Sequence, residues 1–303
     1  MKKKGDNMNK PRLIDPRKIY KTGKFKDQEQ DTPALQDDMI PKPDCGEKTY
    51  KGHEKLLDRN ALITGGDSSI GRAAAIAYAR EGANVAIQFF PGEEKDANEV
   101  KELIEKEGRK ALLIPIDLRE DNAATYIVDK TIEEFGQLDV LVLNAAQQIA
   151  NESLQELPIK QVEDSFKVNV ISMFETVKAA EKHLPAGSTI VITTSVQAYD
   201  PSPSLIDYAA TKAATKSLIL SLAKHFAPKG IRVNGVAPGP IWTPLQLDKG
   251  QPQGKIPEFG IHSLLERAGQ PAELAHIYVY LASNDSSYVT SQVYGITGGE
   301  AID

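Results

Sequence analysis

A tyrosine and a lysine stand four residues apart at Tyr208 and Lys212. On a helix this spacing puts both side chains on one face, about 6 Å apart along the axis. A lysine ammonium in that position favours the phenolate, so we expect it to lower the pKa of Tyr208 and make the phenol an acid and base near neutral pH. Ser195 ends an apolar run 13 residues earlier. Its hydroxyl could hold a substrate oxygen while Tyr208 exchanges the proton.

The same spacing occurs twice more, at Tyr20 and Lys24 and at Tyr126 and Lys130. The first pair lies in a proline-rich segment. The second lies on a predicted helix with no polar strand end beside it. We therefore interpret both pairs as coincidental, and only the pair at Tyr208 as chemically significant.

A glycine-rich segment, residues 64–71 (TGGDSSIG), joins a short apolar run to a stretch with helical spacing. Glycine allows a tight turn and close backbone approach, and a helix N-terminus offers amides and partial positive charge to a diphosphate. An ordinary βα turn is the alternative interpretation. The strand before and the helix after favour nucleotide binding, and the predicted contacts are Gly65, Asp67, Ser68, Ser69, Ile70 and Gly71.

The hydrophobic pattern predicts the scaffold that positions these residues. Seven short apolar runs alternate with helical segments, and strands that are apolar throughout are typical of a parallel sheet covered on both faces. We expect one doubly wound α/β domain with a seven-stranded, mainly parallel sheet. The predicted strands are 61–63, 84–90, 111–116, 138–143, 189–194, 231–236 and 293–296; after the glycine-turn helix, the predicted helices are 98–107, 123–135, 159–183, 208–226 and 271–282.

Ligands of such sheets bind beyond the carboxyl ends of the strands. Asp117 follows the third predicted strand, and Asn144, Ala145 and Ala146 follow the fourth. The small side chains would let a flat ring or a ribose lie against the backbone. Each of these signals is weak by itself.

The composition is that of a folded, soluble protein. The chain has 303 residues, a formal net charge of −6 and one cysteine, Cys45. An acidic chain lacks the basic face that nucleic acid or an anionic membrane requires, and nowhere do 18 apolar residues follow one another. With one cysteine and no signal peptide, we expect a cytoplasmic protein. The five histidines show no ligand spacing, so we expect no metal.

Residues 1–57 differ from the rest of the chain. They hold 14 Lys and Arg against 10 Asp and Glu, a net +4, which leaves −10 for residues 58–303. Five prolines and few aliphatic residues cannot offset the ordering entropy of an independent domain. Two alternatives stay open: a disordered tail, or an extended arm laid on the acidic body or on a neighbouring subunit through Tyr20, Phe25, Leu35, Ile40 and Tyr50.

Together these residues resemble the short-chain dehydrogenase/reductase family over residues 57–303. The resemblance implies a Rossmann-type sheet, a nicotinamide cofactor, a homotetramer, and a catalytic tetrad of Asn169, Ser195, Tyr208 and Lys212. Residues 166–169 (FKVN) look like the family's asparagine segment, and residues 238–243 (PGPIWT) like the turn that holds the nicotinamide carboxamide. Asp117 matches the residue that contacts adenine. The further contacts that we predict from the likeness are Phe89, Leu118, Pro238, Gly239, Ile241 and Thr243, with Tyr208 and Lys212 also contacting the cofactor.

Two positions depart from the family pattern. Ser69 stands where a third glycine is usual, and Leu143, Asn144, Ala145 and Ala146 replace Asn-Asn-Ala-Gly. Serine and alanine are small, so we expect the turn to survive. The arm, with its PALQDDMIPKP segment, looks like that of a bacterial subgroup of the family.

The choice between NAD and NADP stays open. Family members that prefer NAD usually carry an acid at the end of the second strand, and those that prefer NADP a base. Here the positions are Gln88, Phe89 and Phe90, while Asp67, Glu93 and Glu94 lie near enough in sequence to repel a 2′-phosphate.

The expected reaction is hydride transfer between NAD or NADP and a carbonyl or alcohol: a small aldehyde, ketone, alcohol or sugar. The loop at 242–269 is rich in proline and glycine and suits a mobile lid over the substrate, although a variable surface loop has the same composition. The alternative function is a catalytically silent dinucleotide sensor or scaffold, and the arm could also serve assembly.

Overall fold

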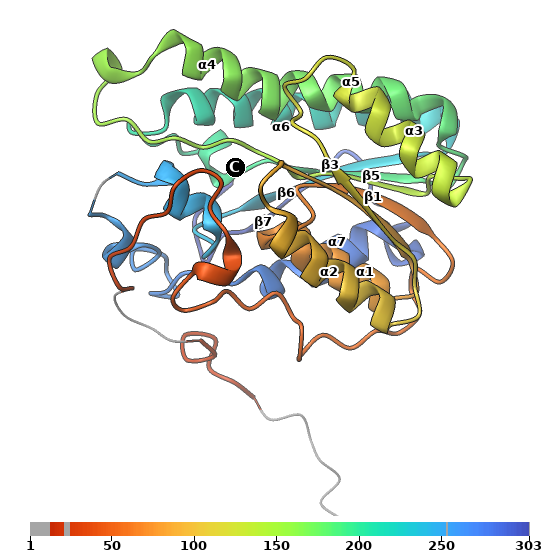
Figure 1. The fold of residues 1–303 in the computed structure, drawn as a ribbon, viewed down its shortest axis with the longest axis horizontal. Helices are drawn as coiled ribbons and strands as arrows, with labels where there is room; N and C mark the ends of the chain where they lie inside the picture. The colour runs from red at the N-terminus through yellow and green to blue at the C-terminus, as the bar shows by residue number, and fades with distance from the viewer. Residues whose placement is uncertain (1–12, 21–24, 253, 303) are drawn as a thin grey trace, which may run out of the picture.

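A seven-stranded parallel sheet lies at the centre of the computed structural model, which describes residues 13–20, 25–252 and 254–302 (Figure 1). The order β3-β2-β1-β4-β5-β6-β7 reverses between β1 and β4, which opens a crevice at their carboxyl ends. The predicted doubly wound sheet is confirmed. Its strands are β1 (Asn60–Thr64), β2 (Asn84–Phe89), β3 (Ala111–Pro115), β4 (Val140–Leu143), β5 (Thr189–Thr193), β6 (Arg232–Pro238) and β7 (Val293–Ile296).

Helices cover both faces of the sheet (Figure 1). One layer holds α3 (Ala123–Phe135), α4 (Ile159–Phe166), α5 (Ser172–Ala180) and α6 (Ile206–Phe226); the other holds α1 (Ser69–Arg80), α2 (Glu94–Lys106) and α7 (Pro271–Ala282). None of the helices in the described part of the chain has the length and apolar character to span a bilayer.

Most predicted boundaries lie within two residues of the observed ones, but two differ in substance. Helix α2 begins at Glu94, four residues before the predicted start, because its first turn is acidic and matches the helix dipole while lacking apolar residues. The helix predicted at 159–183 is four segments: α4, a π-helical turn (Lys167–Ile171), α5 and a 3₁₀ turn (Glu181–His183).

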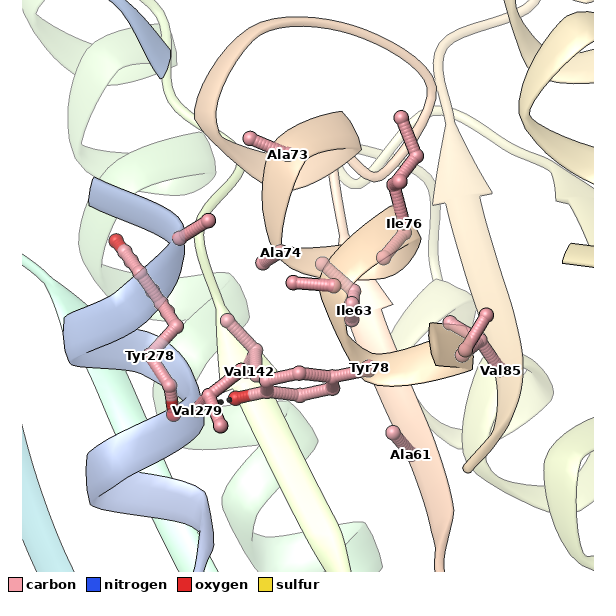
Figure 2. Packing of buried hydrophobic residues seen from close by; sticks show 14 of the residues in the cluster. Ala61, Ile63, Ala73, Ala74, Ile76, Tyr78, Val85, Val142, Tyr278 and Val279 are labelled. Carbon is pink, nitrogen blue, oxygen red and sulfur yellow. Dashed lines mark hydrogen bonds between the residues drawn. The ribbon is translucent and has the colours of Figure 1, made fainter. Parts of the chain in front are cut away.

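Small residues bring α1 close to the sheet and to α7. The run Ala73 to Ala75 is buried, and Tyr78 reaches across to α7, where its hydroxyl donates to the carbonyl oxygen of Tyr278 at 3.1 Å (Figure 2). Since a buried hydroxyl without a partner is costly, this bond fixes the spacing between the two helices.

The described part of the N-terminal segment lies on the body of its own chain, as the arm alternative proposes. Phe25 stacks on Trp242 with ring centroids 3.8 Å apart. The Trp242 indole donates to the carbonyl oxygen of Pro41 at 2.8 Å, and the Tyr50 hydroxyl bonds to Glu81. Residues 1–12 and 21–24, including Lys24, lie outside the described residues.

The arm also packs against the loop that we predicted to be a mobile lid. Trp242, Leu247, Ile256 and Phe259 form a buried cluster with Met39 of the arm. The amide of Gln30 donates to the carbonyl oxygen of Leu247 at 3.2 Å, and the Thr32 hydroxyl bonds to Asp248. The arm therefore holds this loop against the body.

We expect Phe25→Ala to loosen the arm. The ring covers the only tryptophan of the chain, so its loss should cost about 1–2 kcal/mol of unfolding free energy and shift Trp242 fluorescence to the red. Urea titration followed by tryptophan emission measures both. Tyr288→Ala, at a fully exposed ring, is the control; an unshifted emission in Phe25→Ala would contradict the packing.

Candidate active site

A cavity of about 980 Å³ opens at the carboxyl ends of β1, β4, β5 and β6. Its volume lies at the upper end of the range for ligand sites. The structure brings almost all the predicted residues to its wall: every one except Gly71, Phe89 and Asn169. These residues come from segments far apart in the sequence, so the sheet topology assembles the site.

Helix α6 carries Tyr208 and Lys212 into this cavity, and both side chains are buried. The Lys212 ammonium lies 5.3 Å from the centroid of the Tyr208 ring and donates to the carbonyl oxygen of Thr193 at 3.1 Å. Ser195 lies two residues beyond the end of β5, near the Tyr208 phenol, and both side chains line the cavity. The phenol, the amine and the hydroxyl thus converge at one wall of the cavity.

The prediction that Lys212 lowers the pKa of Tyr208 was wrong. Burial raises the pKa of Tyr208 to about 12, and the neighbouring Ser195 hydroxyl opposes this only in part. Burial lowers the pKa of Lys212 to about 7. Desolvation disfavours the charged form of each group, and it outweighs their mutual attraction because Lys212 points its ammonium at a backbone carbonyl. The site therefore holds a neutral phenol, which is a proton donor.

Asn169 lies behind the cavity wall, fully buried in the π-helical turn. Its amide nitrogen donates to the carbonyl oxygen of Gln147 at 2.9 Å and to the Thr211 hydroxyl at 3.0 Å, and its carbonyl oxygen accepts from the Gln147 amide at 2.7 Å. It thereby joins the loop after β4 to α6, next to Lys212. The extra residue of a π turn aims the side chain inward, a frequent feature of functional sites.

A second network supports Lys212 from the opposite helix layer. Thr193, which accepts from Lys212, donates its own hydroxyl to Asn144 at 3.1 Å. Its single hydroxyl proton is then used, so the Tyr278 hydroxyl, 2.6 Å away, donates to Thr193. Tyr278 is the residue whose carbonyl oxygen accepts from Tyr78 (Figure 2). Packing of α1 against α7 therefore supports the cavity wall that carries Lys212.

The glycine-rich turn has the shape of a diphosphate cradle. Gly65 has a φ of 62°, and its amide donates to the Gln88 side chain at 3.1 Å. Gly71 does not line the cavity; a Cβ there would lie 1.9 Å from the Gly65 carbonyl oxygen, so glycine permits the close crossing of turn and helix. Ser69 adopts the left-handed φ of 58° that a glycine would favour. The first amides of α1 have no acceptor within the helix.

Two carboxyl groups, those of Asp67 and Glu93, also line the cavity. Asp67 is buried, and its Oδ2 has no hydrogen-bond partner among the described residues. Burial raises the pKa of both carboxyl groups, and a neighbouring carboxylate adds to the rise: Asp96 at Asp67, and Asp67 at Glu93. An orphaned acceptor suits a hydroxyl donor such as a ribose. The residues present therefore fit a dinucleotide, with its diphosphate at the turn and a ribose beside Asp67.

The structure differs from the sequence prediction at Phe89. This side chain packs into the core between the sheet and α1, because alternate residues of β2 face opposite sides; Gln88 and Phe90 line the cavity instead.

Sequence reasoning missed the contribution of the arm. Thr32, Pro33 and Ala34 line the cavity beside the glycine-rich turn, and Gln36 bonds to that turn from behind. No local signal marks them, since their role depends on where an extended segment lands on the body. Polar side chains that also line the cavity include Gln147, Gln148, Gln197, His262 and Glu300.

Comparisons with known proteins agree with this geometry. The family model described as enoyl-(acyl carrier protein) reductase matches residues 65–300. The oxidoreductase YhxD of Bacillus subtilis is 57% identical and covers 96% of this chain and 99% of its own. NADPH-dependent aldehyde reductase 1, chloroplastic, of Arabidopsis thaliana is 43% identical over 89% of this chain and 96% of its own. A short chain dehydrogenase from Burkholderia cenocepacia, solved with NADP, has 31% identity and a TM-score of 0.76, covering 81% of this chain and 99% of that chain.

We expect Tyr208→Phe to lower turnover by about 10²–10⁴-fold, because it removes the proton donor and keeps the ring. Dinucleotide affinity, measured by calorimetry, should stay nearly unchanged. Tyr126→Phe is the matched control, since Tyr126 and Lys130 share the spacing but lie on α3, with Tyr126 exposed. Substantial residual turnover in Tyr208→Phe would remove this residue from the acid and base role.

Proposed function

The chain belongs to the short-chain dehydrogenase/reductase family and is an NAD(P)-dependent oxidoreductase; from that premise we propose that it reduces the carbonyl group of a small aldehyde, ketone or sugar. Tyr208 is the proton donor in this proposal. The observation that carries it is the neutral, buried phenol beside Ser195 and Lys212 at the cavity wall.

A neutral phenol fits the reductive direction that we propose. A carbonyl oxygen gains negative charge during reduction and needs a proton at once, which a neutral phenol supplies. Alcohol oxidation would need the phenolate, which burial disfavours here. Ser195 holds the substrate oxygen, and the Lys212 ammonium stabilises the phenolate that remains after proton transfer. The bound dinucleotide supplies the hydride.

We propose the following division of cofactor contacts. The amides of the glycine-rich turn hold the diphosphate, Lys212 also holds the nicotinamide ribose, and the segment 238–243 holds the carboxamide. Asp117 and Leu118 flank the adenine. Asn169 acts as a positioning residue, since its bonds go to Gln147 and Thr211 rather than into the cavity.

The substrate end of the cavity favours a hydroxylated carbonyl compound. Glutamine side chains at positions 147, 148 and 197 and the residues His262 and Glu300 provide donors and acceptors there. Gln148 also bonds to the carbonyl oxygen of Gly250 at 2.6 Å, which ties the loop 242–269 to this wall. The arm and this loop together exclude water from the reaction.

We further propose a cytoplasmic homotetramer in which residues 1–57 form the arm and 58–303 the catalytic domain. The single cysteine supports a reducing compartment. Exposed apolar side chains on one helix layer support assembly, because such patches mark interfaces; they are Ile159, Ile171, Phe174, Ile206 and Leu220. We also propose that the arm contacts a neighbouring subunit.

The proposed reaction is tested by a reduction screen of aldehydes, ketones and sugars with NADH and NADPH. We expect turnover of hydroxylated aldehydes or sugars, read as loss of reduced cofactor. Turnover of alcohols with the oxidised cofactor should become comparable only at alkaline pH, where the phenol of Tyr208 ionises. Tight dinucleotide binding with no turnover of any compound would favour the silent sensor instead.

Cofactor preference should depend on pH. The raised pKa of the Asp67 and Glu93 carboxyls leaves them partly neutral near pH 7, and they ionise as the pH rises. Carboxylates repel a 2′-phosphate, so the ratio of kcat/KM for NADPH to that for NADH should fall between about pH 6 and pH 9. Glu93→Gln should flatten this fall. The exposed neighbour Glu94, changed to Gln, is the control; equal slopes in all three proteins would exclude Glu93 from this role.

A further inference from the structure

A glutamine of the arm reaches the glycine-rich turn. Gln36 is fully buried, and its side-chain oxygen accepts from the backbone amide of Ser69 at 2.8 Å. Its side-chain nitrogen donates to the Cys45 sulfur at 3.4 Å. A buried amide side chain is tolerated only when both ends have partners, so Gln36 is fitted to this position.

Its partner Ser69 is the residue with the unusual backbone. A φ of 58° lies in the left-handed region, which costs a residue with a Cβ about 1–2 kcal/mol. Ser69 also stands at the start of α1, where amides lack helical acceptors. The Gln36 oxygen satisfies this one amide and thereby supports the left-handed conformation of Ser69 at the cavity wall.

We propose that Gln36 is a positioning residue for dinucleotide binding, which offsets the strain of serine at a left-handed position of the diphosphate turn. The inference rests on the proposed placement of the diphosphate at this turn. Gln36 acts through Ser69 and does not line the cavity.

The arm is anchored so that Gln36 cannot move independently. The Asp96 carboxylate of α2 accepts from the backbone amides of Gln36 at 2.6 Å and Asp37 at 3.3 Å. Arg72 of α1, almost fully buried, donates to Glu47 of the arm at 3.1 Å. The arm is thus tied to both helices that flank the turn, and undocking it would release the Ser69 amide.

The test measures dinucleotide affinity by calorimetry without substrate. Gln36→Leu keeps the volume and removes the acceptor, so the Kd for the reduced dinucleotide should rise roughly tenfold, the usual worth of one hydrogen bond. Ser69→Gly in the same chain should restore the affinity, because glycine adopts the left-handed conformation without a Cβ cost. In the protein without dinucleotide, amide hydrogen exchange at the start of α1 should be faster in Gln36→Leu than in the unchanged protein. The increase should be smaller in the double variant that also carries Ser69→Gly.

Controls separate this effect from general loosening of the arm. Among the described residues, the Gln28 side chain bonds to Lys26 and Ile40 of the arm, so Gln28→Leu should leave the Kd unchanged. If Gln36→Leu does not fold, Gln36→Asn takes its place, since the shorter side chain withdraws the acceptor with less change in volume. Trp242 emission reports whether the arm stays docked.

The outcomes distinguish the inference from the placement on which it rests. Ser68 stands at the N-cap of α1 without a side-chain capping bond, so Ser68→Asp removes no such bond and adds a negative charge at the turn, which should weaken dinucleotide binding. If it does not, the placement of the diphosphate is wrong. If Ser68→Asp weakens binding while Gln36→Leu does not, or while Ser69→Gly fails to restore the affinity, the role of Gln36 is overturned and the placement stands.

Discussion

Burial of a lysine beside a tyrosine is the constraint on which the site depends. Lys212 is 1% exposed, and a buried ammonium persists only with partners. The carbonyl oxygen of Thr193 at the end of β5 provides one. That carbonyl is fixed by the sheet, and the Thr193 hydroxyl by Asn144 and Tyr278, so the position of one amine involves β4, β5, α6 and α7. A parallel sheet buried on both faces supplies that rigidity.

The protonation states follow from the same burial. At neutral pH, desolvation keeps the phenol of Tyr208 protonated and leaves Lys212 near the middle of its titration, since its pKa is about 7. A site prepared in this way donates a proton readily and accepts one poorly. The spacing of four residues therefore places Tyr208 and Lys212 together, while their burial favours proton donation by Tyr208 over proton acceptance.

The arm extends the site beyond the sheet. It packs on the loop 242–269 through Phe25 and Met39, lines the cavity through residues 32–34, and reaches the turn through Gln36. Loops over a substrate site usually belong to the least stable parts of a fold. Here the loop shares a buried cluster with the arm, so the arm stabilises the loop against the body.

The sequence by itself determined the sheet, most element boundaries, and the shared helical face of Tyr208 and Lys212, because apolar periodicity and helical spacing are local properties. That Ser195 lies near this pair depends on the sheet topology. The sequence also located the glycine-rich turn. The tertiary structure alone decided that Phe89 faces the core, that Tyr208 is held neutral, and that Gln36 meets Ser69. These three features depend on which surfaces pack together: the face of the sheet to which a residue points, the water that a side chain loses, and a contact between residues 33 positions apart. No local sequence pattern contains that information.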